Sequence, residues 1–258
     1  MYYPNKKNIF SIIFLMAFIN GAWAQDQFKV LLYTRQDAWH YESIPTAIEA
    51  FRKMSDQHQF DFSWTQNADD LTQDLSSYGA LVFLNANADI LTQEQLAGLK
   101  TYMNAGGGFV GIHACSNGDI RKPWFDKLIG GVFKDHPKLQ TGIVQNVAPL
   151  FPSNLHLPEQ FLWSDEWYNF THLQSQAMRV VLTVDESSYD PAMGYNETPL
   201  VGMGKVHPVA WYQEYDGGRS FYTSLGHKPE VFLSQMFLDH IYGGLYWVVN
   251  GKKANNEY

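Results

Sequence analysis

His113 stands where α/β enzymes often place a reactive side chain. Gly111-Ile112-His113-Ala114-Cys115 overlaps the end of an apolar stretch, Gly108 to Ile112, that is typical of a buried strand, and a sharp turn there would expose His113 at the sheet edge. An imidazole can act as a general base, donate a hydrogen bond or bind a metal, because its unperturbed pKa is about 6.5. The alternative is a histidine that binds the carbonyls of its own turn. Cys115 is more typical of a small buried residue.

Two adjacent carboxylates, Asp165 and Glu166, form a second candidate group. They lie in Ser164-Asp165-Glu166-Trp167-Tyr168, inside a long loop rich in aromatic residues. Partial burial among such rings raises the pKa of a glutamic acid and fits it for acid or base catalysis. Trp167 and Tyr168 are side chains of the kind that stack on sugar rings. The alternative is a solvated acidic loop above an apolar lid, and the pattern leaves both open.

Three further histidines lie in expected loops, where functional residues are common. His227 lies between an expected strand and the last expected helix, His40 follows the first expected strand, and His136 precedes Pro137. Histidines at the ends of different strands can converge on one site. The alternative for each is a histidine that caps a helix or packs against its neighbours.

Strands and helices alternate in the first half of the chain. Apolar stretches typical of strands lie at 28–34, 60–65, 80–84 and 108–112, and apolar residues at helical spacing predict helices at 43–57 and from Thr92 to Gly106. This alternation predicts an α/β fold in which helices cover both faces of a parallel sheet. Ligands bind such sheets beyond the carboxyl ends of the strands, which is where His40 and His113 lie.

The pattern is less regular after Gly130. We expect strands at 142–147 and 179–184 and a closing helix at 231–249. Asp216-Gly217-Gly218 separates two further strand-like stretches, 208–215 and 219–224, and is a strong hairpin signal. The second half is therefore predicted to be irregular and rich in β-structure.

The first 24 residues resemble a secretory signal peptide. Lys6 and Lys7 precede an apolar core at 9–19, and Ala22-Trp23-Ala24 has the small-x-small pattern that signal peptidases cleave. The apolar core is about half of the roughly 20 residues that span a bilayer. We therefore expect cleavage after Ala24, a periplasmic or secreted protein with no membrane contact after cleavage, and one domain over residues 25–258.

Net charge and cysteine content limit the classes of partner and the cross-links that the protein can have. Residues 1–24 hold two lysines and no acid, so their removal takes the formal net charge from −8 to −10, which disfavours nucleic acid and anionic membranes. A small neutral ligand such as a sugar is easier to accommodate. Cys115 is the single cysteine of the chain, so no intramolecular disulfide can form. The oligomeric state stays open.

Five motifs in order resemble the trehalose-utilisation (ThuA-like) family, and the resemblance covers most of residues 28–250. It implies a flavodoxin-like three-layer fold related to class I glutamine amidotransferases, with a mostly parallel sheet and an irregular β-rich second half. It also implies a link to trehalose and other glycosides, including keto-sugars. The motifs are His40-Tyr41-Glu42-Ser43-Ile44, Gly111-Ile112-His113-Ala114, Gly130-Gly131-Val132-Phe133 with His136-Pro137, Asp165-Glu166-Trp167-Tyr168, and 208–212 through 222–227.

The resemblance to amidotransferases does not extend to their nucleophile. Those enzymes carry a Gly-x-Cys-x-Gly elbow and a later His-x-Glu pair, whereas here His113 takes the cysteine's position and Cys115 that of the final glycine. An imidazole cannot form the glutamyl thioester that this chemistry needs. Glu230 also lies one residue too far from His227 for the pair. Glutaminase activity is therefore disfavoured.

These residues predict an exported enzyme that acts on a glycoside or keto-sugar by acid/base hydrolysis or elimination. We expect His113, Glu166 and His227 to be catalytic, with the acid and base roles of His113 and Glu166 unassigned. We expect the sugar to contact His40, Asp165, Trp167, Tyr168 and His136. No cofactor is certain, and a divalent metal held by His113, His227 and a carboxylate is a variant. The alternative is a non-catalytic carbohydrate-binding or sensing protein on the same fold.

Overall fold

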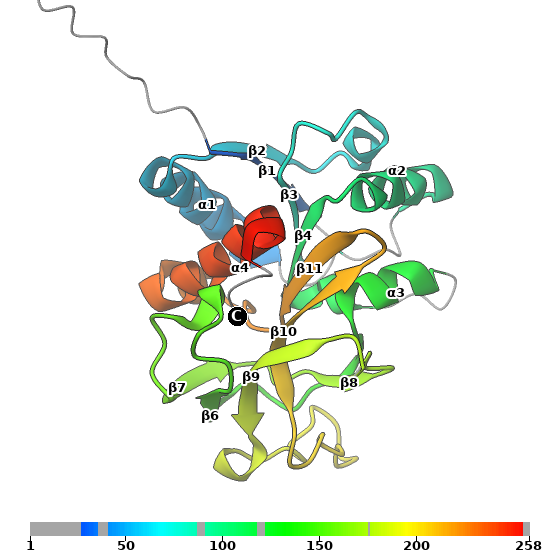
Figure 1. Cartoon of the computed structure of the whole chain (residues 1–258). Coiled ribbons are helices and arrows are strands. Elements are labelled where there is room, and N and C mark those ends of the chain that lie inside the picture. Colours follow the sequence, from blue (N-terminus) through cyan, green and yellow to red (C-terminus); the bar gives the residue numbers. More distant parts are fainter. Residues whose placement is uncertain (1–26, 36–40, 87–90, 118–121, 175, 255–258) are drawn as a thin grey trace, which may run out of the picture.

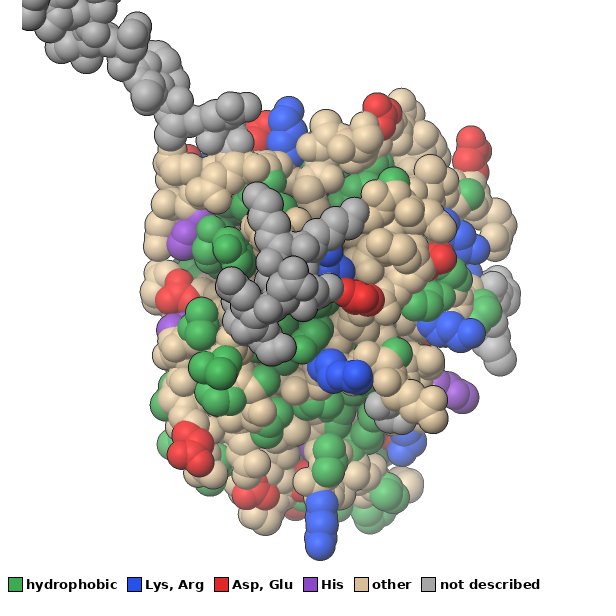
Figure 2. Space-filling view, viewed as in Figure 1, with side chains coloured by type: hydrophobic (Ala, Val, Ile, Leu, Met, Phe, Trp, Pro, Cys, Tyr) green, Lys and Arg blue, Asp and Glu red, His purple; other side chains and the backbone are tan. Residues whose placement is uncertain are grey.

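The computed structural model describes residues 27–35, 41–86, 91–117, 122–174 and 176–254. His40 and the expected signal peptide lie outside the described residues. Among those residues, no helix combines the length and the apolar character needed to cross a membrane. Lys and Arg side chains are scattered among Asp and Glu over the face in Figure 2.

The described residues form a nine-stranded sheet in the order β2-β1-β3-β4-β11-β10-β9-β6-β7 (Figure 1). Five neighbouring strands run parallel. They are β2 (Asp61–Thr65), β1 (Lys29–Thr34), β3 (Ala80–Leu84), β4 (Gly108–Ile112) and β11 (Gly218–Thr223). Their carboxyl ends meet at one edge, as the alternation of strands and helices predicts.

The remaining strands extend this sheet in antiparallel fashion. They are β10 (Pro208–Tyr215), β9 (Arg179–Asp185), β6 (Gln140–Asn146) and β7 (Gln160–Asp165), while β5 (Val132–Asp135) and β8 (Asn169–Thr171) pair separately. Asp216 and Gly217, at φ 51° and 87°, form the turn between β10 and β11. Positive φ at both positions is the type I′ geometry of tight hairpins, so the predicted hairpin is confirmed.

Helices cover both faces of the parallel strands. They are α1 (Ile44–His58), α2 (Gln93–Asn104), α3 (Pro123–Ile129) and α4 (Gln235–Ala254) (Figure 1). Alternate residues of β1 point to opposite faces, so Leu32 belongs to the core beneath α1 and α4 and Leu31 to the core beneath α2 and α3. The predicted three-layer α/β fold with a β-rich second half is confirmed.

Two local predictions need correction. The closing helix does not begin at Val231, because a short 3-10 helix, Pro229–Leu233, with Ser234 as its C-cap, precedes α4, which begins at Gln235. Asp165 does not lie in a long loop but is the last residue of β7, paired with Gln140 of β6. This pairing fixes Asp165 and orients the next residue, Glu166.

Candidate functional site

His113 follows β4 directly on a strained turn. Its φ of 54° is in the left-handed region, which residues with a Cβ rarely adopt and which is frequent at active sites. Gly111 permits the turn, because a Cβ there would lie 2.6 Å from Sγ of Cys115. Tyr222 of β11 donates a hydrogen bond to the His113 carbonyl at 2.9 Å. The elbow expected after β4 is therefore present.

Hydrogen bonds fix the orientation of the His113 ring. Nδ1 lies 2.7 Å from the carbonyl oxygen of Ser224, and since a carbonyl only accepts, Nδ1 donates. Nε2 then points the other way, 2.8 Å from the hydroxyl of Tyr168 and 3.5 Å from Oε2 of Glu166. The side chain is fully buried, so the prediction that it is exposed at the sheet edge is wrong.

Glu166 lies at the centre of a group of imidazoles. Its Oε2 is 3.2 Å from Nδ1 of His227, 3.5 Å from Nε2 of His113 and 3.6 Å from Nε2 of His136. We call these four residues the histidine–glutamate cluster. Ligand atoms of Glu166, His113 and His227 lie within 4.8 Å of one another, which brings a carboxylate and two histidines close enough to share one cation.

The environment of Glu166 differs from the aromatic one that its sequence neighbours predict. Burial alone raises the pKa of this carboxyl, but the imidazoles of His113, His227 and His136 outweigh burial and hold the pKa well below its ordinary value. The predicted rise is therefore wrong. Glu166 is ionised at neutral pH and can accept a proton or bind a cation.

His136 and His227 form the exposed side of the cluster. Their side chains are 20% and 23% exposed, against 5% for Glu166. Nδ1 of His136 donates to the carbonyl of Pro137 at 2.8 Å, which turns Nε2 toward Glu166. A ligand arriving from solvent would meet these two rings first.

The family model for trehalose utilisation matches residues 29–248. The chain belongs to the ThuA family. A ThuA-like protein from Bacteroides uniformis is 25% identical, with a TM-score of 0.76 over 91% of this chain and 96% of that chain. A ThuA-like protein from Parabacteroides merdae is 18% identical, with a TM-score of 0.71 over 87% of this chain and 90% of that one.

A more distant likeness extends to part of a larger enzyme. The β-galactosidase from Bacillus circulans sp. alkalophilus is 12% identical, with a TM-score of 0.54 over 83% of this chain and 30% of that chain, and shares the fold alone. No curated protein matches the sequence.

In this ThuA chain, Asp165 positions other residues instead of facing the site. Its carboxylate accepts the backbone N–H groups of Glu166, Gly226 and His227 at 3.0 to 3.2 Å. The indole of Trp163 donates to it as well, at 3.1 Å. Because Asp165 is buried and both its oxygens are engaged, it holds the β11 loop against β7 and does not fit the expected role as a sugar contact.

Trp167 and Tyr168 do not offer the stacking surface that we expected. Trp167 is fully buried and packs in the core against Gly142, so neither face of its ring is open to a sugar. Tyr168 is also buried, and its hydroxyl lies 2.8 Å from Nε2 of His113. Burial, followed by the charge of Glu166, raises the pKa of Tyr168 well above its ordinary value. Its hydroxyl therefore stays protonated and donates to His113.

Two groups around the cluster carry no signal in the sequence. Tyr195 is 64% exposed and stands edge-on to the His136 ring at 5.6 Å between centroids. Asn85, after β3, accepts the Ala114 N–H at 3.3 Å and so secures the turn behind His113. Both lie in irregular segments, where neither hydrophobic period nor a motif marks a functional residue.

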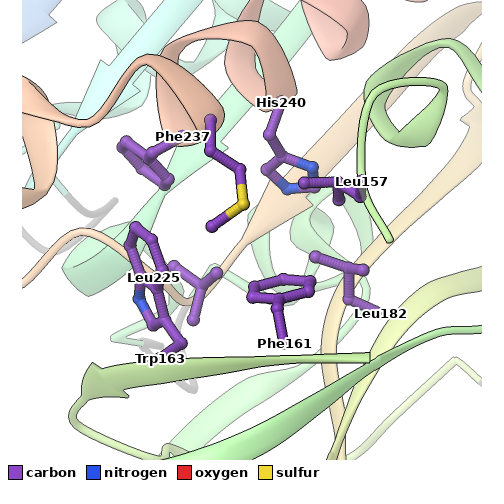
Figure 3. A pocket seen from close by; sticks show the side chains of 8 residues that line it. Leu157, Phe161, Trp163, Leu182, Leu225, Phe237 and His240 are labelled. Atoms are coloured by element: carbon purple, nitrogen blue, oxygen red, sulfur yellow. The ribbon is translucent and has the colours of Figure 1, made fainter. Parts of the chain in front are cut away.

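A small pocket lies between α4 and the strands β7 and β9 (Figure 3). Trp163 and Leu225 belong to its lining, which is apolar apart from the ring of His240. Such a lining offers few partners for sugar hydroxyls, so the histidine–glutamate cluster is the better candidate site.

Proposed function

We propose that this ThuA-family protein acts on a glycoside or keto-sugar of the trehalose-related class by acid/base chemistry at the histidine–glutamate cluster. The observation that carries the proposal is the ionised carboxylate of Glu166 facing three imidazoles, two of them partly exposed. The family's link to trehalose utilisation supplies the substrate class.

The proposed reaction needs one proton acceptor and one proton donor. A 3-keto group acidifies the proton on C2, so a base can remove it and an acid can protonate the glycosidic oxygen as the C1–O bond breaks. The products are an unsaturated keto-sugar, to which water later adds, and the freed alcohol. Glu166 is the acceptor, because its carboxyl is ionised. An imidazole of the cluster is the donor, and no covalent nucleophile is required.

Cys115 has no part in this proposal. The thiol is completely buried, and burial raises its pKa well above the ordinary value. A buried neutral thiol is a poor nucleophile. This supports the expectation that the protein does not hydrolyse glutamine.

We also propose that the protein meets its sugar outside the cytoplasm, in a periplasm or after secretion. The support is the predicted signal peptide at residues 1–24. The molecular mass of the protein recovered from the periplasm or medium of expressing cells, determined by mass spectrometry, tests this. Cleavage after Ala24 gives a chain that begins at Gln25, whereas an intact N-terminus in cytoplasmic protein would contradict export.

Product analysis tests the activity. Purified residues 25–258 are incubated with trehalose, 3-ketotrehalose and a panel of other 3-keto-glycosides, and the mixture is followed by mass spectrometry. We expect 3-ketotrehalose to release glucose and trehalose to stay intact. A keto-glycoside that raises the melting temperature but is never transformed would instead indicate a carbohydrate-binding or sensing protein.

A further inference from the structure

We propose that the cluster binds one divalent transition-metal ion, of the zinc class, through Nε2 of His113, Nδ1 of His227 and Oε2 of Glu166. Three independent features carry this inference: the spacing of the three atoms, the hydrogen bonds that aim the rings, and the state of the carboxylate oxygen. His136 borders the position that stays open for substrate.

The spacing of the ligand atoms fits a metal better than an ordinary ion pair. Zinc holds nitrogen and oxygen ligands at about 2.0 to 2.2 Å in a tetrahedral arrangement, which separates neighbouring ligand atoms by about 3.3 Å. Oε2 of Glu166 lies 3.2 Å from the His227 nitrogen and 3.5 Å from that of His113. The nitrogens of His113 and His227 lie within 4.8 Å of each other. One ion can therefore contact all three atoms.

Hydrogen bonds at the far side of the site aim its ligands inward. Nδ1 of His113 donates to the Ser224 carbonyl at 2.7 Å, which leaves the lone pair of the neutral ring on Nε2, between Glu166 and the Tyr168 hydroxyl, so a bound cation would replace the hydrogen bond from Tyr168. Metal-binding histidines typically donate their second nitrogen to a carbonyl or carboxylate in this way. The backbone of His227 is held by Asp165, at 3.2 Å. The side chains are thus oriented in advance to bind a metal cation, which accepts lone pairs.

Oε2 of Glu166 is the unexplained group at the centre. It is buried, and the imidazole nitrogens at 3.2 to 3.6 Å lie close to it without good hydrogen-bond geometry. A buried charged oxygen without a well-formed hydrogen bond is a favourable place for a water molecule or a cation to bind. A cation among Oε2 and the two imidazole nitrogens would satisfy the carboxylate and the rings together.

The ligand types select the kind of metal. Two imidazoles and one carboxylate suit zinc and its neighbours in the first transition row, whereas magnesium and calcium prefer oxygen ligands. Three protein ligands with an open fourth position are the pattern of catalytic rather than structural zinc sites.

This inference adds a metal ion to the proposed function, and the catalytic role of that ion rests on the proposed function. A cation in the cluster would bind the carbonyl oxygen of the keto-sugar and polarise it, as a Lewis acid does. Polarisation acidifies the neighbouring C2–H, and with Oε2 on the cation the second oxygen of Glu166, Oε1, would accept that proton, so the reaction class stays the same.

Metal binding is measured without reference to turnover. Untagged protein is stripped with a chelator, titrated with Zn²⁺ by calorimetry, and analysed for metal after dialysis. Co²⁺ provides a second readout through its visible absorption, which is strong in tetrahedral sites. We expect one ion per chain, and a loss of affinity greater than about 100-fold in Glu166→Gln and His227→Ala, because even partners of ligands alter affinity by about 10- to 100-fold.

Matched variants keep the test decisive. Glu230→Gln and His172→Asn change exposed residues of the same types that are not members of the cluster and should bind like wild type. Circular dichroism identifies any variant that fails to fold. Because His227 is partly exposed, its replacement should disturb folding less than the replacement of buried Glu166. Equal Zn²⁺ affinity in wild type and both cluster variants, or no binding by wild type, would overturn the inference.

The outcomes also separate this inference from the proposed function. Zinc bound by the cluster without keto-glycoside turnover leaves the metal site standing and removes the activity. Full turnover by a protein that binds no Zn²⁺ removes the metal site and leaves the activity standing.

Discussion

The backbone N–H of His227 donates to Oδ1 of Asp165 at 3.2 Å, across 62 positions of sequence. This bond joins the loop after a parallel strand, β11, to the end of an antiparallel strand, β7. It brings His227 from one half of the sheet beside Glu166 from the other. Asp165 therefore builds the cluster without facing its ligand.

Replacement of Asp165 by Asn should lower stability and activity together. The amide offers one oxygen where the carboxylate has two, and its NH₂ group meets backbone donors, so we expect a loss of about 1–3 kcal/mol in the free energy of unfolding. Urea denaturation measures this. Asp56→Asn, an exposed change on α1, should stay within about 0.5 kcal/mol of wild type. Equal stability of the two variants would show that the Asp165 bonds are dispensable.

Replacement of Tyr168 by Phe removes the hydroxyl that lies 2.8 Å from Nε2 of His113. We expect unfolding free energy to fall by about 1 kcal/mol and kcat on a keto-glycoside to fall by about 10-fold or more, because Nε2 of His113 loses the hydroxyl of Tyr168. Steady-state kinetics measures the second effect. Tyr246→Phe, on the exposed surface of α4, provides the control, and a wild-type kcat in Tyr168→Phe would separate this hydroxyl from the chemistry.

Replacement of Tyr195 by Ala tests whether the exposed ring next to His136 contacts the sugar. Loss of a stacking partner worth about 0.5–1.5 kcal/mol should raise KM by about 2- to 12-fold. Since the ring is 64% exposed, the melting temperature should change little. Tyr246→Ala is the matched control. A fall in kcat with unchanged KM would instead assign Tyr195 a part in the reaction.

His240 should make stability sensitive to acid. Burial lowers its pKa to about 3, against about 6.5 in the unfolded chain. The unfolded state binds more protons between these values, so stability is full above pH 6.5 and falls as pH drops toward 3, by up to about 1.4 kcal/mol per unit.

Denaturation of wild type and His240→Phe between pH 7 and pH 4 measures this slope. The variant lacks the ionisable ring and should show a shallower decline, whereas His172→Asn, an exposed control, should follow wild type. Parallel curves for wild type and His240→Phe would contradict the assigned pKa.

Sequence patterns predict the parallel strands well and the antiparallel half less well. The bounds of β3 and β4 match their predicted ranges because both strands are buried on both faces and read as unbroken apolar runs. By contrast, β5 and β8 are three or four residues long and pair across about 40 positions. No local period marks such strands. Helix α3 was missed as well, because seven residues are too few to show a helical apolar period.

The candidate site was predictable in its members but not in its arrangement. Strand ends indicated His113 and His227, and a paired carboxylate indicated Glu166. The neighbours of Glu166 in sequence are aromatic, yet its neighbours in space are imidazoles, and Trp167 lies buried in the core. That reversal, from a raised to a lowered pKa, depends on contacts between residues 30 to 61 positions apart.

The rate at which Glu166→Gln transforms 3-ketotrehalose is the most direct test of the central claim, that the cluster carries the chemistry. The change keeps the shape of the side chain and removes its charge. We predict glucose release by wild type and by Glu230→Gln at equal rates, and a rate at least about 100-fold lower in Glu166→Gln. Equal release by all three proteins, or none by wild type on any keto-glycoside, would contradict the account.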